Sequence, residues 1–178
     1  ETALDGSWER ARPEDFFPLL QAIFPSDRFI AEDLGILNGE VCSFRDLYEL
    51  PGMIVLQFCF EESVPKVRDF PAERFLYTGT HDNPTVREWY ENLAEDSPSR
   101  INLLSFIREN LPLFAGLGLE DLTDVEASIH TILCLIAQDS GCDNIIVPVQ
   151  DILGLGSSAR MNVPGTALGN WQWRLTDF

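Results

Sequence analysis

Acidic and amide side chains follow several short apolar runs of this sequence, which is where a parallel sheet would gather reactive groups. Position alone does not select one acid, because Glu32, Glu61 and Glu62 all directly follow such a run. Two carboxyl groups that flank one sugar are the minimal equipment of a glycosidase-type site. Four runs end in this way: 29–31 before Glu32-Asp33, 53–60 before Glu61-Glu62, 75–77 before the 78–80 turn and His81-Asp82-Asn83, and 145–149 before Gln150-Asp151.

These runs are apolar throughout, which is typical of parallel strands covered by helices on both faces. Segments with helical spacing or helix-start signals separate them, and the pattern predicts βαβ units with about four parallel strands. Such strands could form a small doubly wound sheet or half of an eight-stranded barrel, and both place functional groups at the carboxyl ends of the strands. The expected helices are 14–24, 41–48, a helix with Asn83 as N-cap and Pro84 at its first position, and one that starts at the capping box 123–126.

Composition excludes some partners. The formal net charge of −17 opposes binding to nucleic acid or to an anionic membrane surface, because both need an electropositive face. No run of 18 apolar residues is present, so no membrane span is expected. The 4 cysteines lack paired spacing, which favours reduced thiols in a cytoplasmic protein.

Two patterns that suggest a cofactor or a metal are weak. Residues 154–159 match a dinucleotide-binding fingerprint, but four residues separate the glycines from the preceding run and Pro164 would end a following helix early. His81 and Asp82 are too few ligands for a metal site, and His130 has no partner one helical turn away. We therefore expect neither a cofactor nor a metal.

Several stretches together resemble consecutive blocks of the 4-α-glucanotransferase family, also called amylomaltases or disproportionating enzymes. The THDN motif alone is weak because related α-amylase-type barrels share part of it. The blocks occur in the family's order and cover most of the chain, which makes the combination specific. They are FIAEDLG at 29–35, LPGMIVLQFCF at 50–60, YTGTHDN at 77–83 and LGLGSSARMNVPGTALGNWQWRL at 153–175.

The resemblance implies an α/β fold, in which residues 1–178 are the C-terminal half of a catalytic (β/α)₈ TIM barrel. It implies that Glu32 is the general acid/base, that Asp82 stabilises the transition state and that His81 contacts the sugar at the cleaved bond. Asp33 is expected to support Glu32 from behind. The substrate-binding residues implied in this way are His81, Asp33, Asn83, Asn162 and Trp171, although the alternating Trp171 and Trp173 leave open which of the two faces the sugar.

The implied activity is transfer of a segment of an α-1,4-glucan to a new 4-hydroxyl, with retention and without a cofactor. The family's nucleophile is an aspartate on the strand before the one bearing Glu32, so we expect it upstream of Glu1 and expect little activity from this chain alone. The unpaired edges of a half-barrel favour self-association.

Two alternatives stay open: a non-catalytic glucan-binding remnant and one half of a split enzyme. The expected location is cytoplasmic, or a plastid if the source is a plant or an alga.

Overall fold

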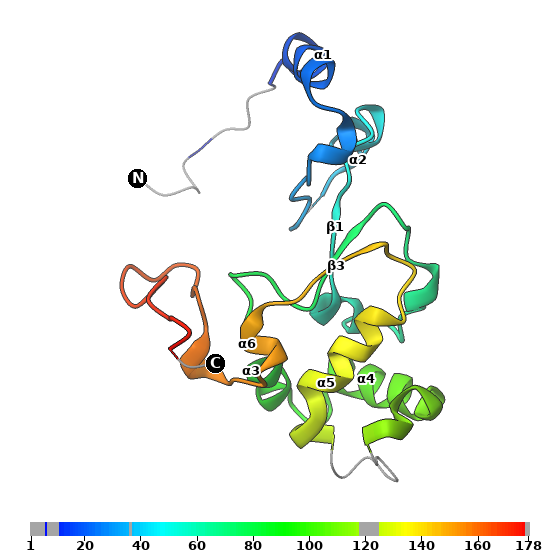
Figure 1. Ribbon diagram of the computed structural model, residues 1–178, viewed down its shortest axis with the longest axis vertical. Helices are drawn as coiled ribbons and strands as arrows, with labels where there is room; N and C mark the ends of the chain where they lie inside the picture. The colour runs from blue at the N-terminus through cyan, green and yellow to red at the C-terminus, as the bar shows by residue number, and fades with distance from the viewer. Residues whose placement is uncertain (1–5, 7–10, 36, 118–124, 177–178) are drawn as a thin grey trace. The chain divides into compact units, whose positions relative to one another are not determined.

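Two structural units make up the chain in the computed structural model, which describes residue 6 and residues 11–35, 37–117 and 125–176 (Figure 1). The first unit is Glu1–Gly52 and the second is Met53–Phe178. The first unit carries Glu32 and the second carries Asp82, so each of the two predicted catalytic residues is described within its own unit.

Two helices pack together in the first unit through aromatic side chains. These helices are α1 (Pro13–Ile23) and α2 (Gly39–Leu47), close to the predicted 14–24 and 41–48. The ring of Phe17 lies 5.1 Å from that of Phe44 and 4.8 Å from that of Tyr48, measured between centroids. Aromatic pairs at such separations stabilise a contact beyond the apolar area that they bury.

The apolar run 29–31 is extended but is not a strand, which corrects the prediction of a strand there. After the short 3₁₀ turn η2 (Ser26–Arg28), Phe29 has φ −113° and ψ 149°, and the N–H of Ala31 donates to the C=O of Pro51 at 2.7 Å. An extended backbone becomes a strand only through a repeated ladder of hydrogen bonds, and this bond to Pro51 does not by itself make one. Glu32 therefore follows an extended segment outside the sheet.

A three-stranded parallel sheet organises the second unit. Its strands are β1 (Met53–Val55), β2 (Phe75–Tyr77) and β3 (Asn144–Ile146), in the order β1-β2-β3. Val55 pairs with Tyr77, and Tyr77 pairs with Ile146, so the three carboxyl ends meet at one edge of the sheet. This confirms the predicted parallel strands in three of the four runs.

Two of the predicted strands are shorter than their apolar runs. The run 53–60 continues after β1 as a 3₁₀ helix, η3 (Leu56–Phe60), and the run 145–149 ends in the short helix α6 (Val149–Ile152). Leu56 and Phe60 in η3 are fully buried. A short apolar run indicates burial but does not distinguish a strand from a helical turn.

Helices supply most of the core of the second unit. They are α3 (Val86–Asn92), α4 (Pro98–Glu109) and α5 (Val125–Gln138), grouped below the sheet in the view of Figure 1. Five apolar side chains along α5, from Val125 to Ile136, are fully buried as their helical spacing predicts. The first part of the predicted capping box, residues 123–124, lies outside the described residues. Shorter 3₁₀ turns are η4 (Val67–Asp69), η5 (Leu111–Leu117) and η7 (Ser157–Ala159).

The predicted N-cap of α3 is wrong by two residues. Thr85 caps the helix, because its side chain accepts a hydrogen bond from the N–H of Glu88 at 3.2 Å. Asn83 instead closes the turn that precedes the helix, where its side chain bonds to Thr80. Both residues are good capping types, and the sequence alone does not show which of them the backbone uses. None of the described helices is long and apolar enough to cross a membrane.

Gly141, in the connection between α5 and β3, is packed too tightly to carry a side chain. Its N–H donates to the C=O of Val67 at 2.9 Å, and an added Cβ would contact the carbonyl oxygen of Phe70 and lie 2.6 Å from that of Arg68. We expect Gly141→Ala to lower the free energy of unfolding by about 1–3 kcal/mol, the usual cost of overpacking. Gly116→Ala is the matched control, because nothing lies within 4 Å of its added Cβ. Equal urea midpoints for the two variants would contradict this packing.

Candidate active site

The loop after β2 presents His81 and Asp82 at its tip. Asn83 Oδ1 accepts hydrogen bonds from both the N–H and the hydroxyl of Thr80, each at 2.8 Å. This side-chain-to-backbone bond closes a tight turn, as Asn does in turns of this kind. The His81 and Asp82 side chains retain 47% and 49% exposure, so both can contact a ligand.

The Asp82 carboxylate contacts two of the predicted substrate-binding residues, Asn162 and His81. Asn162 Nδ2 donates to Asp82 Oδ1 at 2.6 Å, and His81 Nε2 lies 3.2 Å from the same oxygen. Asp82 and Asn162 are 80 residues apart in the sequence, so the fold brings them together. These contacts fix the orientation of a carboxylate that is still accessible to solvent.

Arg160 joins this loop to two other segments. Its guanidinium donates to the C=O of Asp82 at 2.9 Å and to the C=O of Asn162 at 2.9 Å. A third nitrogen lies 3.5 Å from Glu88 Oε1 on α3, and Glu88 Oε2 is buried with no hydrogen-bond partner among the residues that the structure describes. Arg160 was not among the residues predicted from the sequence, although it lies within the family block 153–175, two residues before Asn162.

Trp171 forms an apolar wall beside His81. Its ring centroid lies 5.0 Å from that of His81, and the two rings are tilted by 38°. The backbone N–H of Trp171 donates to the C=O of Met161 at 2.7 Å. The backbone of Trp171 is left-handed, with φ 61°, an uncommon conformation for a bulky residue. Trp171 is 53% exposed, so part of this wall faces solvent.

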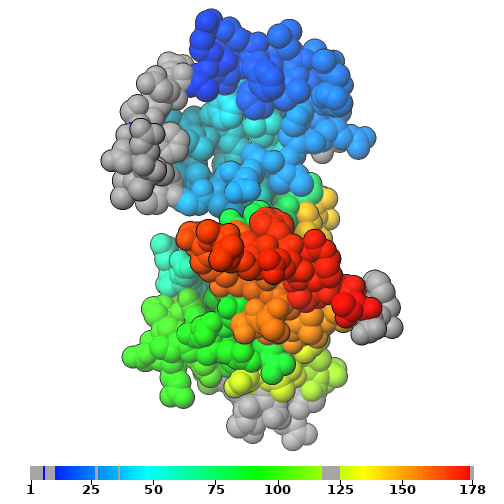
Figure 2. All heavy atoms as spheres, turned by 90° about the vertical axis from the view of Figure 1, so that its left-hand side faces the viewer, coloured from blue at the N-terminus to red at the C-terminus, as the bar shows by residue number. Residues whose placement is uncertain are grey.

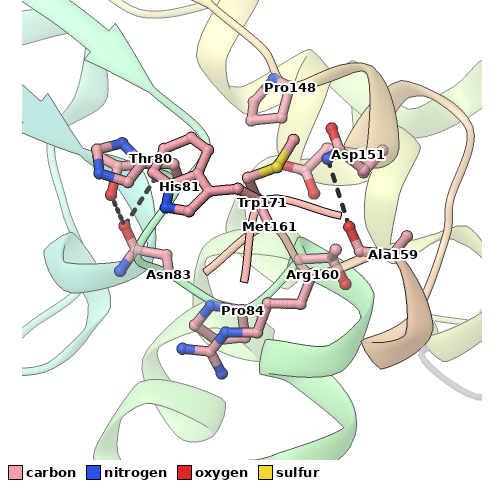
Figure 3. A pocket seen from close by; sticks show the side chains of 13 residues that line it. Thr80, His81, Asn83, Pro84, Pro148, Asp151, Ala159, Arg160, Met161 and Trp171 are labelled. Carbon is pink, nitrogen blue, oxygen red and sulfur yellow. Dashed lines mark hydrogen bonds between the residues drawn. The ribbon is translucent and has the colours of Figure 1, made fainter. Parts of the chain in front are cut away.

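A cavity of about 200 Å³ adjoins these side chains. Figure 3 shows Thr80, His81 and Asn83 on one side of it and Asp151 and Ala159 on the other. The segment that supplies Ala159 to Trp171 lies over one face of the second unit, in orange to red in Figure 2. Lining residues that follow β2 and β3, such as Thr80 and Pro148, place the cavity at the carboxyl edge of the sheet, where the sequence pattern predicted polar side chains.

Asp151 lies beneath the loop as a buried carboxylate. Thr78 Oγ1 donates to Asp151 Oδ2 at 2.7 Å, and the N–H of Val86 donates to Oδ1 at 2.8 Å. Burial raises the pKa of Asp151, while these two hydrogen bonds and the nearby His130 act to lower it. Only its place after an apolar run drew attention to Asp151 in the sequence.

Glu32 and Asp33 belong to the first unit. Glu32 is exposed, whereas the Asp33 side chain is only 6% exposed and pairs with Arg45 at 2.7 Å. The hydrogen bond that Arg45 Nη1 donates to Asp33 Oδ2 is the main reason that the pKa of Arg45 is raised. Asp33 thus anchors its segment to α2, while contact of Glu32 and Asp82 with one sugar stays a prediction.

Three other candidate sites from the sequence have less support than the His81–Asp82 loop: the Glu61-Glu62 pair, a metal site and a dinucleotide-binding site. Glu61 and Glu62 are exposed directly after η3. Among the described residues, no group of three or more His, Cys, Asp or Glu side chains could hold a metal ion. Residues 157–159 form only a 3₁₀ turn, so the fingerprint at 154–159 lacks the long helix that a dinucleotide pyrophosphate requires.

Comparison with known proteins identifies the family of this chain. The model of the 4-alpha-glucanotransferase family matches residues 1–177. The 4-alpha-glucanotransferase of Aquifex aeolicus is 37% identical over 179 residues, which cover 99% of this chain and 34% of that protein. The chloroplastic/amyloplastic 4-alpha-glucanotransferase of Solanum tuberosum is 34% identical over 177 residues, which cover 97% of this chain and 28% of that protein. The chain thus spans about a third of the length of the curated relatives that it matches.

Solved structures show the same relationship. The amylomaltase from Streptococcus agalactiae, solved in complex with acarbose, matches with a TM-score of 0.80 and 27% identity, and the match covers 99% of this chain and 33% of that one. The amylomaltase from Corynebacterium glutamicum matches with a TM-score of 0.55 and 18% identity, over 80% of this chain and 24% of that one, which supports the fold alone. These matches confirm the predicted resemblance and the predicted fold class, an α/β chain with the architecture of part of a TIM barrel.

Proposed function

The chain belongs to the 4-alpha-glucanotransferase family, and we propose that it supplies one part of the catalytic site of such an enzyme. By full-length enzyme we mean a polypeptide of the curated relatives' length that contains this chain. We propose that the full-length enzyme cleaves an α-1,4-glucan and transfers the released segment to the 4-hydroxyl of an acceptor glucan or glucose, with retention. The observation that carries this proposal is the cluster of Asp82, His81 and Asn162 beside a cavity at the carboxyl edge of a parallel sheet.

In this proposal Asp82 stabilises the transition state. The sugar ring flattens and gains positive charge as the glycosidic bond breaks, so hydrogen bonds to its hydroxyls strengthen at that point. Asp82 is suited to this role because Asn162 and His81 both contact Oδ1 while the side chain stays 49% exposed. Such a carboxylate needs little rearrangement to meet the transition state.

Glu32 acts as the general acid and then as the general base. It protonates the departing oxygen, and afterwards takes the proton of the incoming 4-hydroxyl. The attacking carboxylate is proposed to lie outside residues 1–178, about 5–5.5 Å from Glu32, as retention requires. Asp33 holds the segment of Glu32 in place through its ion pair with Arg45.

The substrate is proposed to be a neutral glucan: a maltooligosaccharide, starch or glycogen. The partly exposed ring of Trp171 offers a flat apolar surface of the kind that sugars pack against, next to the imidazole of His81. The related amylomaltase was solved with acarbose, and we propose that the cavity beside Trp171 accepts a ring of the same ligand. The reaction requires neither a cofactor nor a metal.

The net charge of −17 makes nucleic acid and anionic membranes poor partners. We place the enzyme in the cytoplasm, or in a plastid if the source is a plant or an alga, because relatives from Solanum tuberosum and Oryza sativa are chloroplastic or amyloplastic. The isolated chain is proposed to self-associate through the edges of its sheet.

Maltotriose tests the activity directly. We expect the full-length enzyme to convert it to glucose and longer oligosaccharides, and the isolated chain to show negligible turnover because it would lack the nucleophile. Appearance of both product classes with the isolated chain would contradict the proposed division of the site. A full-length enzyme that binds maltoheptaose in calorimetry but forms no products would favour the binding-remnant alternative. Activity that returns when a separate partner chain is added would favour a split enzyme.

A further inference from the structure

We propose that Asp151 is a positioning residue for glucan transfer, which fixes both ends of the loop that carries His81 and Asp82. The proposal rests on the proposed function, since it concerns how Asp82 is held. Thr78 is the first residue after β2, and Val86 is the first residue of α3. Asp151 therefore bonds to the loop where it leaves the sheet and again where it enters the helix.

Each carboxylate oxygen serves one end of this loop. Oδ2 accepts from the Thr78 hydroxyl at 2.7 Å, and Oδ1 accepts from the Val86 N–H at 2.8 Å. The N–H groups in the first turn of a helix have no partner within the helix, so the carboxylate satisfies a donor that would otherwise be buried unpaired. Thr78 and Val86 are fully buried and Asp151 is 2% exposed, so water does not compete for these bonds.

A position that serves packing alone is unfavourable for a carboxylate. Burial of a charge costs free energy unless hydrogen bonds compensate for it, and a neutral side chain would avoid that cost. Charged acceptors form shorter and stronger hydrogen bonds than neutral ones, which suits a tether between two elements. His130 and Cys134 on α5 also interact electrostatically with this carboxylate.

The loop is also held from its other side. Arg160 donates to the backbone C=O of Asp82 at 2.9 Å, so Asp151 fixes the loop ends and Arg160 fixes its tip. Displacement of this loop would move the Asp82 carboxylate relative to Asn162, which bonds to it at 2.6 Å. A misplacement of about 1 Å by a change away from the chemistry can cost about 10²-fold in rate.

Two substitutions separate this role from simple packing. Asp151→Ala removes both acceptors. Asp151→Asn keeps Oδ1 for the Val86 N–H, and its Nδ2 can donate to the Thr78 hydroxyl, which can rotate to accept. In the full-length enzyme we expect Asp151→Ala to lower kcat for maltotriose by about 10- to 100-fold and to change KM much less. A misplaced Asp82 stabilises the transition state less well, whereas binding of the substrate in its ground state is affected less. Asp151→Asn should restore most of kcat.

Hydrogen exchange measures the tether itself and does not depend on activity. In this chain we expect the Val86 amide to exchange faster in Asp151→Ala than in wild type, and at a rate closer to wild type in Asp151→Asn, whose neutral oxygen is the weaker acceptor. Asp143→Ala is the control for both measurements, because Asp143 is an exposed residue just before β3, at the opposite end of the sheet. If Asp151→Ala does not fold, Thr78→Val removes one tether in a side chain of the same shape and should lower kcat several-fold.

The outcomes distinguish the tether from the proposed function. A wild-type kcat in Asp151→Ala with a fast-exchanging Val86 amide would overturn the positioning role, as would a low kcat that Asp151→Asn fails to restore. If the wild-type full-length enzyme transfers no glucan, the proposed function fails. The exchange rates then still show whether Asp151 holds the loop.

Discussion

Glu32→Gln is expected to lower glucan transfer by the full-length enzyme by about 10²- to 10⁴-fold, the range of general acid–base catalysis. Glutamine has nearly the same shape but can neither protonate the departing glycosidic oxygen nor accept the proton of the incoming hydroxyl. Exposure of Glu32 allows it to reach a ligand, and the Asp33–Arg45 ion pair beside it does not depend on its charge. Release of glucose from maltotriose measures the effect.

The matched controls are Glu61→Gln and Glu62→Gln, which change exposed glutamates that also follow an apolar run. Both should retain transfer close to the wild-type level. An aryl maltoside with a good leaving group needs no proton donor, so it should partly rescue the cleavage step of Glu32→Gln if Glu32 is the acid. Residual transfer above about 1% in Glu32→Gln would be a loss smaller than the expected range. If a control variant then lost its transfer activity, the acid/base role would belong to the glutamate changed in that variant.

Asp82→Asn is expected to reduce kcat by about 10²- to 10³-fold and to change KM far less. Hydrogen bonds that strengthen in the transition state of glycosyl transfer contribute several kcal/mol, and about 1.4 kcal/mol corresponds to a tenfold change in rate. The amide oxygen of asparagine can still accept from Asn162, which bonds to Asp82 at 2.6 Å in wild type. The loop contact therefore survives while the negative charge is lost.

Asp143→Asn is the control, because it removes the charge of an exposed aspartate before β3, at the other end of the sheet. It should leave kcat and KM for maltotriose unchanged. A fall in kcat/KM for Asp82→Asn that comes entirely from KM would show that Asp82 binds substrate without favouring the transition state. That result would contradict its proposed role.

Much of the second unit could be predicted from local sequence. The apolar runs at 53–55 and 75–77 form strands, and the periodicity of α5 identifies its buried face. The run 29–31 looks the same in sequence but is not part of the sheet, because strand formation depends on a partner's hydrogen bonds and not on apolar character. The start of α3 could likewise not be predicted from local sequence. Asn83 and Thr85 are both residue types that cap helices, and the structure uses Thr85.

The site could be predicted only in part. The family blocks named His81, Asp82, Asn83, Asn162 and Trp171, which lie together in the second unit in the structure. Asp151 and Arg160 were missed because their importance comes from tertiary contacts between distant segments, and Asp151 and Thr78 are 73 positions apart in the sequence. A buried carboxylate at a strand exit has no local pattern that separates it from an exposed one.

A crystal structure of the full-length enzyme with acarbose bound is the most direct test of the central claim, that Glu32 and Asp82 act on one glucose unit. We expect the two carboxylates to contact the same ring of the ligand, with Trp171 and His81 beside it. Finding Glu32 and Asp82 at opposite ends of the barrel, or facing separate cavities, would contradict the account.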